Sequence, residues 1–249
     1  MERIEELLVE DVSHSFGFDD ILKDINFKLQ KGKVLSIVGP SGGGKTTLLH
    51  LCAHLLDLEE GKIKNSFESS SYAFQEARLL PWKNVIDNIS LGLKAKGIKK
   101  DKREEESRKI ALEFGLDEDD FEKFPKDLSG GMKQRVSFAR AMVTKPSLLF
   151  LDEPFSALDI GLKKELQNML IKTIEKENLS ILFITHDLME AIKLSDEVLL
   201  LKAEPVGHIV KTYKYDVPQS MRDDEFVYEQ TAKLLSNRTI IETFELELK

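Results

Sequence analysis

The chain has 249 residues, of which 41% are hydrophobic and 32% are charged, and its formal net charge at pH 7 is −8. This length is enough to bury one sizeable core, and the composition is that of a globular protein. The acidic balance and the lack of a long basic run exclude nucleic acid as the default partner.

Two features of the sequence predict where the protein works. The first residues are charged and lack the apolar core of a signal peptide, and no apolar run approaches the ~20 residues that cross a bilayer. The single cysteine, Cys52, lies in a leucine-rich stretch, so we expect a buried thiol in a reducing compartment. We therefore expect a cytoplasmic protein that reaches a membrane only through a partner.

Short apolar runs alternate with helical patterns along most of the chain. The predicted elements are strands at 33–39, 147–152, 180–186, 197–201 and 207–217 and helices at 46–56 and 220–237. The second and third of these strands are apolar runs bounded by polar residues, which is typical of a parallel sheet buried on both faces. The alternation predicts an α/β core covered by helices.

Residues 85–145 differ from the rest because they contain helical stretches, such as 101–116, and no convincing strand. We interpret this segment as a mostly helical insertion into the core. The predicted organisation is one domain, with its α/β core in residues 1–84 and 146–249 and a helical subdomain at about 85–145.

The segment "GPSGGGKTT" at 39–47 follows a predicted strand and precedes a predicted helix. It matches the phosphate-loop pattern G-x-x-x-x-G-K-[ST], with Gly39, Gly44, Lys45 and Thr46 at the fixed positions. Glycines let backbone N–H groups surround phosphate oxygens, Lys45 can reach the β- and γ-phosphates, and the Thr46 hydroxyl can bind Mg²⁺. This context favours a P-loop nucleotide site over a flexible turn.

Three chemically active side chains lie at the ends of predicted strands. Asp152 is the last residue of the strand at 147–152, and Glu153 follows it. His186 is the last residue of the strand at 180–186. The carboxyl edge of a parallel sheet is where ligands bind, so Asp152 is expected to hold Mg²⁺ and Glu153 to polarise the attacking water. His186 is expected to sense the γ-phosphate. The pair His50 and His54 has the spacing of half a zinc site but lacks further ligands, so we assign no metal there.

A second pair of glycines, Gly130 and Gly131, follows Ser129 in "LSGGMKQR" at 128–135 and precedes a predicted helix. Unpaired N–H groups and the helix dipole make this arrangement an anion site. One chain therefore contains two candidate phosphate-binding segments.

Taken in order, "GPSGGGKTT", "FQEARLLPW", "LSGGMKQRVSFARAM", "LLFLDEP", "SALD" and "ITHD" resemble the motifs of the ATP-binding cassette (ABC) ATPases. The resemblance covers nearly the whole chain. The segment "FQEARLLPW", followed by "NVIDNISLGL", is similar to that of nitrate, sulfonate and taurine importers. The resemblance implies a P-loop NTPase fold with a β-rich part at the N-terminus, ATP and Mg²⁺ as cofactors, and ATP hydrolysis coupled to the transport of a small solute.

The resemblance also implies roles for individual residues. Phe16 stands where an aromatic ring stacks on adenine, although nearby Phe18 leaves that choice open. Gln75 matches a glutamine of the Mg²⁺ and water network, and Asp159 matches a loop aspartate that crosses between subunits. The expected site residues are Phe16, Gly39, Pro40, Ser41, Gly42, Gly43, Gly44, Lys45, Thr46 and Thr47 for ATP, Thr46, Gln75 and Asp152 for Mg²⁺, and Gln75, Glu153 and His186 for catalysis.

In this family two cassettes stack head to tail, and the signature segment of one closes over the ATP held by the other. The resemblance therefore implies that Ser129, Gly130 and Gly131 contact the ATP of a partner subunit. The implied partners are a second copy of the chain, integral membrane permease subunits and, indirectly, a solute-binding protein. The implied location is the inner face of the cell membrane.

The segment 77–84, after Gln75, carries Leu79, Leu80 and Trp82 without a clear period. We expect it to face a partner, the alternative being that Trp82 pins the loop to the core.

Two other functions stay open. One is a soluble ABC ATPase acting on nucleic acid or ribosomes. Such ATPases of DNA repair carry long coiled coils between the two ATP-binding motifs, which are absent here, and those acting on ribosomes usually carry two cassettes in one chain. An inactive scaffold is disfavoured because Lys45, Glu153 and His186 are all present.

Overall fold

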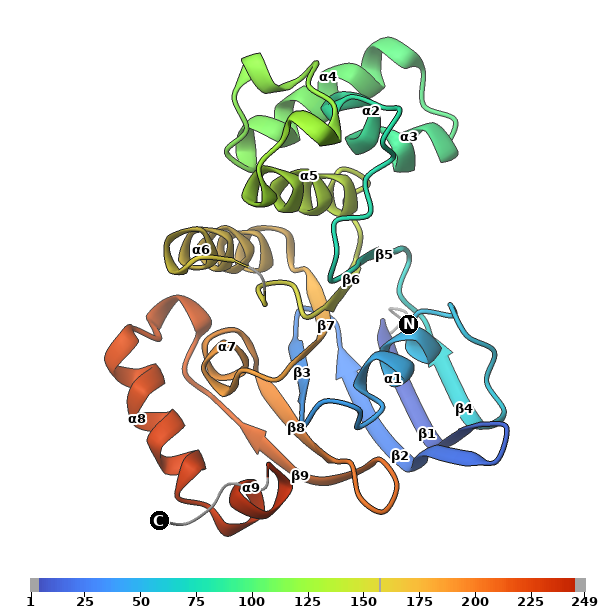
Figure 1. The fold of residues 1–249 in the computed structure, drawn as a ribbon, viewed down its shortest axis with the longest axis vertical. Helices are drawn as coiled ribbons and strands as arrows, with labels where there is room; N and C mark the ends of the chain where they lie inside the picture. The colour runs from blue at the N-terminus through green and yellow to red at the C-terminus, as the bar shows by residue number, and fades with distance from the viewer. Residues whose placement is uncertain (1–4, 157, 245–249) are drawn as a thin grey trace.

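The computed structural model describes residues 5–156 and 158–244, and it contains two sheets with helices packed around them (Figure 1). The strands are β1 (Glu6–Phe16), β2 (Asp19–Gln30), β3 (Val34–Val38), β4 (Glu60–Asn65), β5 (Ser70–Ala73), β6 (Leu148–Asp152), β7 (Ser180–Thr185), β8 (Glu197–Lys202) and β9 (His208–Lys214). The helices are α1 (Lys45–Cys52), α2 (Val85–Ile89), α3 (Leu91–Ala95), α4 (Lys100–Glu113), α5 (Gly130–Met142), α6 (Ile160–Glu177), α7 (Leu188–Leu194), α8 (Asp224–Leu235) and α9 (Arg238–Thr243). Short 3₁₀ helices lie at Glu118–Asp120, Pro125–Asp127 and Gln219–Met221.

The larger sheet has the strand order β5-β6-β7-β3-β8-β9, and the smaller has the order β2-β1-β4. Strands β5, β6, β7, β3 and β8 are parallel, whereas β9 is antiparallel to β8. The smaller sheet is antiparallel throughout and forms the β-rich N-terminal part. The predicted α/β class with a mainly parallel sheet is confirmed.

The central strands are apolar on both faces because both faces of the larger sheet are covered. Every residue of β3, β6 and β7 is buried. In β6, Leu148 and Phe150 join a cluster with α1 and the smaller sheet, whereas Leu149 and Leu151 join a cluster with α5 and α6. Alternate side chains of a strand point to opposite faces, so this sandwiched position favours apolar side chains on both faces of the strand. The polar residues of these strands, such as Ser36 and Ser180, are buried as well.

Helix α1 ends at Cys52, whereas the sequence predicts a helix to residue 56. His54 adopts a left-handed conformation with φ of 54°. Its N–H bonds the carbonyl of Leu51 at 3.1 Å, and the Leu55 N–H bonds the carbonyl of His50 at 2.8 Å. This pair of bonds is a Schellman motif, which usually has glycine at the left-handed position. The sequence lacks that glycine, so the end of the helix was not predicted.

The expected burial of Cys52 is confirmed, and this burial raises the pKa of the thiol. The described residues include no helix that combines the length and the apolar character needed to span a bilayer.

Helices α2 to α5 occupy the chain between β5 and β6, two strands that pair with each other in the sheet. Figure 1 shows these helices gathered at the upper end of the view, apart from both sheets. Phe114 and Phe138 stack within them, and Phe138 also stacks on Phe155, which follows β6. The helical segment therefore leaves and re-enters the sheet at its edge and is anchored beside the carboxyl end of β6.

Candidate active site

The phosphate-loop pattern lies between β3 and α1, at the carboxyl edge of the larger sheet. Gly42 and Gly44 have φ of 79° and 86°, a region that side chains with a Cβ rarely adopt. A Cβ on Gly39 would lie 2.3 Å from the carbonyl oxygen of Leu201. The loop therefore needs glycine for its own conformation and packing.

The Lys45 side chain is buried under this loop, and its Nζ donates to the carbonyl oxygens of Gly39 at 2.9 Å and Pro40 at 2.7 Å. Burial lowers the pKa of the Lys45 ammonium group, and the nearby carboxylates of Glu153 and Asp152 oppose that shift. An ammonium group has three N–H donors, so one remains for a phosphate oxygen.

Asp152 ends β6 beside the start of α1. Its Oδ1 lies 3.4 Å from the Thr46 hydroxyl, and its Oδ2 lies 3.3 Å from the Tyr72 hydroxyl. Burial raises the pKa of the Asp152 carboxyl, while the hydrogen bond from Tyr72 lowers it. Thr46 and Asp152 therefore present two oxygen atoms to one point, and Tyr72 orients the carboxylate from β5.

Glu153, His186 and Gln75 come together from three separate segments. The Glu153 Oε2 atom lies 3.1 Å from Nδ1 of His186 and 3.3 Å from Nε2 of Gln75. Glu153 has φ of 41°, and its N–H bonds the carbonyl of Ile184 in β7 at 3.1 Å. A left-handed conformation is uncommon for a residue with a Cβ and often marks a functional site.

The second glycine pair lies at the start of α5. The Ser129 side chain caps this helix by accepting from the N–H of Met132 at 3.2 Å, and Ser129 and Gly130 are exposed. Within residues 5–156 and 158–244, no hydrogen bond or ion pair joins Ser129, Gly130 or Gly131 to the phosphate loop. The structure thus separates the two glycine segments that the sequence contains.

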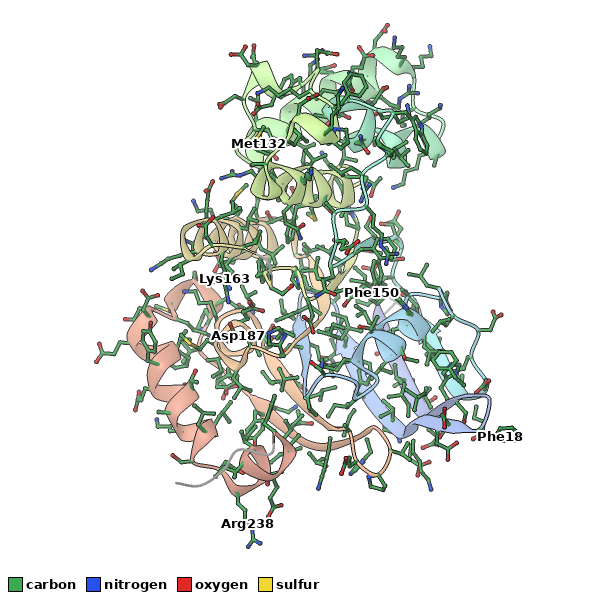
Figure 2. The ribbon with its side chains drawn as sticks, viewed as in Figure 1. Phe18, Met132, Phe150, Lys163, Asp187 and Arg238 are labelled. Carbon is green, nitrogen blue, oxygen red and sulfur yellow. The ribbon has the colours of Figure 1, made fainter. Side chains whose placement is uncertain are left out.

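Four other residues named from the sequence lie at the surface: Asp159, Phe16, Phe18 and Trp82. Asp159 is exposed and caps α6 by accepting from the N–H of Leu162 at 3.0 Å. Phe16 ends β1, half exposed, with its ring against the edge of His14, whereas Phe18 is fully exposed at the right of the view (Figure 2). Trp82 is 71% exposed, so the alternative that it pins its loop to the core is wrong.

Sequence reasoning missed two residues that contact this site. Tyr72 bonds Asp152, and the Ser156 hydroxyl lies 3.4 Å from Nε2 of Gln75 and 3.0 Å from the carbonyl of Glu153. Alternation along a strand places Tyr72 and Phe74 on one face, and their rings do lie 4.5 Å apart. No pattern in the sequence indicates that this face meets Asp152.

A family model described as "ABC transporter" matches residues 22–156 of the chain. The aliphatic sulfonates import ATP-binding protein SsuB of Corynebacterium glutamicum is 39% identical over 227 residues, which are 91% of each chain. The aliphatic sulfonates import ATP-binding protein SsuB 1 of Shouchella clausii is 37% identical over 235 residues, which are 94% of this chain and 91% of that protein.

The fold is also similar to that of a solved structure, the dimeric ATP-binding cassette MJ0796 in a post-hydrolysis state bound to ADP and Pi. The TM-score is 0.75 with 26% sequence identity, and the match covers 84% of this chain and 98% of that one. The arrangement of the two sheets and the helical segment is therefore that of an ATP-binding cassette.

Proposed function

The chain belongs to the ABC transporter family, and on that premise we propose that it is the ATP-hydrolysing subunit of an importer. The family and its relatives make the chain an ATPase. The observation that carries the assignment of its catalytic residues is the convergence of His186 and Gln75 on one carboxylate oxygen of Glu153, beside the phosphate loop.

In this proposal the backbone N–H groups of residues 39–47 and the Nζ of Lys45 hold the phosphates of ATP, and Phe16 or Phe18 stacks on adenine. Hard divalent cations prefer oxygen ligands, and the Thr46 hydroxyl and Asp152 carboxylate, 3.4 Å apart, fit Mg²⁺. Gln75 would add an amide oxygen. When bound, Mg²⁺ neutralises charge that develops on the phosphates.

Glu153 orients and deprotonates the attacking water, and His186 holds the Glu153 carboxylate through Nδ1. Gln75 reaches the same oxygen from the segment that leads into the helical insertion, so its position links hydrolysis to the movement of that segment.

A second copy of this chain is the proposed partner on ATP binding. Ser129, Gly130 and Gly131 reach the ATP of the other subunit, and the loop of Asp159 crosses between the subunits. The dimeric cassette of similar fold supports this arrangement. The sulfonate-importing relatives support an aliphatic sulfonate or a related small solute, such as nitrate or taurine, as the transported compound. The proposal includes permease subunits at the inner face of the membrane and a solute-binding protein beyond them.

Trp82 offers the test of the transport role, because it is 71% exposed in the segment that follows Gln75. We expect Trp82→Ala to weaken co-purification with membrane subunits about 30-fold or more, the effect of losing an interface hot spot. The ATPase activity of the isolated chain should stay within about twofold, since surface changes alter stability little.

Leu112→Ala is the matched control because Leu112 is also apolar and exposed, at 48%, but lies on α4. If both variants co-purified with the same amount of membrane subunits, Trp82 would not belong to the docking surface. If the unaltered chain co-purified with ribosomes or nucleic acid and with no membrane protein, the transport assignment would be wrong.

A further inference from the structure

Lys163 joins helix α6 to the loop that carries His186. Its Nζ lies 2.7 Å from Oδ2 of Asp187 and 2.6 Å from Oε1 of Glu190. Figure 2 shows Lys163 on α6 next to Asp187, where α7 begins. Neither carboxylate belongs to the proposed catalytic set.

The two carboxylates take part in hydrogen bonds with residues on both sides of His186. The Thr185 hydroxyl donates to Oε2 of Glu190 at 2.6 Å and accepts from the N–H of Asp187 at 3.0 Å. The Asp187 Oδ1 atom caps α7 by accepting from the N–H of Met189 at 2.8 Å. His186 therefore lies between two residues that share one hydrogen-bonded network, and Lys163 ties that network to α6.

The network depends on the positive charge of Lys163. Glu190 is only 3% exposed, and burial raises the pKa of its carboxyl while the hydrogen bond from Lys163 opposes that rise. Burial lowers the pKa of Lys163 itself, but Asp187 and Glu190 together hold that pKa above its usual value. A buried carboxylate without a partner is strongly destabilising, so the cation cannot be removed without consequence.

Lys163 also belongs to the first turn of α6, which begins after Asp159. Its backbone N–H donates to the carbonyl of Asp159 at 2.9 Å. The Lys163 side chain therefore connects the first turn of α6, which follows Asp159, to the loop that holds His186.

We propose that Lys163 is a positioning residue for ATP hydrolysis: it holds the His186 loop in place against Glu153 and ties that loop to Asp159 at the start of α6. This inference rests on the roles proposed above for Glu153, His186 and Asp159. A small displacement of His186 would break its 3.1 Å contact with Glu153.

The experiment uses the full chain and compares Lys163→Met with Lys164→Met. Lys164 is the matched control because it pairs with Asp224 at the same 2.7 Å, but both partners are exposed and the pair lies outside the network. We expect Lys163→Met to lower kcat about 10- to 100-fold, the range for a misplaced catalytic group, with KM for ATP within twofold. Lys164→Met should keep both constants, and Lys163→Arg should recover most of kcat.

Lys163→Met also leaves the buried Glu190 unpaired, so a second variant separates positioning from folding. In Lys163→Met/Glu190→Gln that charge is removed, and the amide oxygen can still accept from Thr185. We expect the thermal stability to recover while kcat stays low, because Asp187 has lost its link to α6. Without nucleotide, hydrogen exchange of residues 185–190 should be faster in this variant than in Lys164→Met.

Normal turnover and unchanged exchange in the stabilised double variant would overturn the proposal and leave Lys163 as a charge partner of Glu190. His186→Ala in the same assay tests the underlying site. Normal turnover by His186→Ala would overturn the catalytic assignment itself. Slow turnover by His186→Ala together with normal turnover by the double variant would overturn only the role of Lys163.

Discussion

The two glycine segments of this chain have similar compositions, but Gly39 in the first is packed against its own chain and Gly130 in the second is not. In the phosphate loop, a Cβ on Gly39 would meet the carbonyl oxygen of Leu201 at 2.3 Å, and Gly42 and Gly44 have positive φ. At the start of α5, a Cβ on Gly130 would meet nothing within 4 Å, and no positive φ occurs there. The first segment needs glycine for its own chain, whereas Gly130 has no such need.

The difference indicates that Gly130 serves contact with another molecule. An exposed glycine at a helix start leaves its N–H accessible and lets another molecule approach the backbone closely. Gly131 has a neighbour within the chain, since its Cβ would lie 2.6 Å from the flexible Leu162 side chain. The open position of Gly130 supports the proposal that this segment serves the ATP of a partner subunit.

The largest expected effect is that of Glu153→Gln. Loss of the general base should lower turnover by ~10²–10⁴. ATP affinity should persist because the phosphate loop is unchanged, so the variant should accumulate an ATP-dependent dimer. Turnover and size-exclusion chromatography with ATP measure the two effects. Near-normal hydrolysis would remove Glu153 from the mechanism.

The next largest effect is expected in mixed dimers that combine two substitutions. Lys45→Ala removes the phosphate-binding ammonium group, and Ser129→Arg blocks the start of α5. If each ATP site is shared between subunits and each subunit carries one substitution, both substitutions fall in the same site and the other site is intact. About one ATP should then be trapped per dimer, because the intact site keeps both of its halves.

The reciprocal dimer is the control for this experiment. With both lesions on one subunit and none on the other, each shared site is damaged once, so no ATP should be trapped. Trapped ATP is the measurement because two sites in one dimer can hydrolyse cooperatively. Loss of trapping in the first dimer and retention in the second would mean that residues 129–131 serve their own chain.

The smallest effect compares Gly39→Ala with Gly130→Ala by thermal unfolding. Gly39→Ala should destabilise the chain by about 1–3 kcal/mol, since the added Cβ overlaps a backbone oxygen that cannot move freely. Gly130→Ala should leave stability within about 1 kcal/mol or raise it, because alanine favours the helix more than glycine does. Equal losses of stability would contradict the contrast between the two segments.

Much of the fold was predictable because its signals are local. The apolar runs at 147–152 and 180–186 correspond to β6 and β7, whose residues are all buried, and the phosphate-loop pattern lies between a strand and a helix as predicted. The end of α1 was not predictable because His54 stands in the left-handed position where glycine is usual. The antiparallel direction of β9 was not predicted either, since a strand pattern carries no direction.

The sequence by itself determined the inventory of chemical groups: a glycine loop with Lys45, the carboxylates Asp152 and Glu153, and His186, each next to a strand or helix whose pattern is local. Only the tertiary structure decided which groups meet. The contact between Glu153 and His186 joins residues 33 positions apart, and Tyr72 reaches Asp152 across 80 positions. Strand order in the sheet creates these contacts, and no local pattern of residues encodes that order.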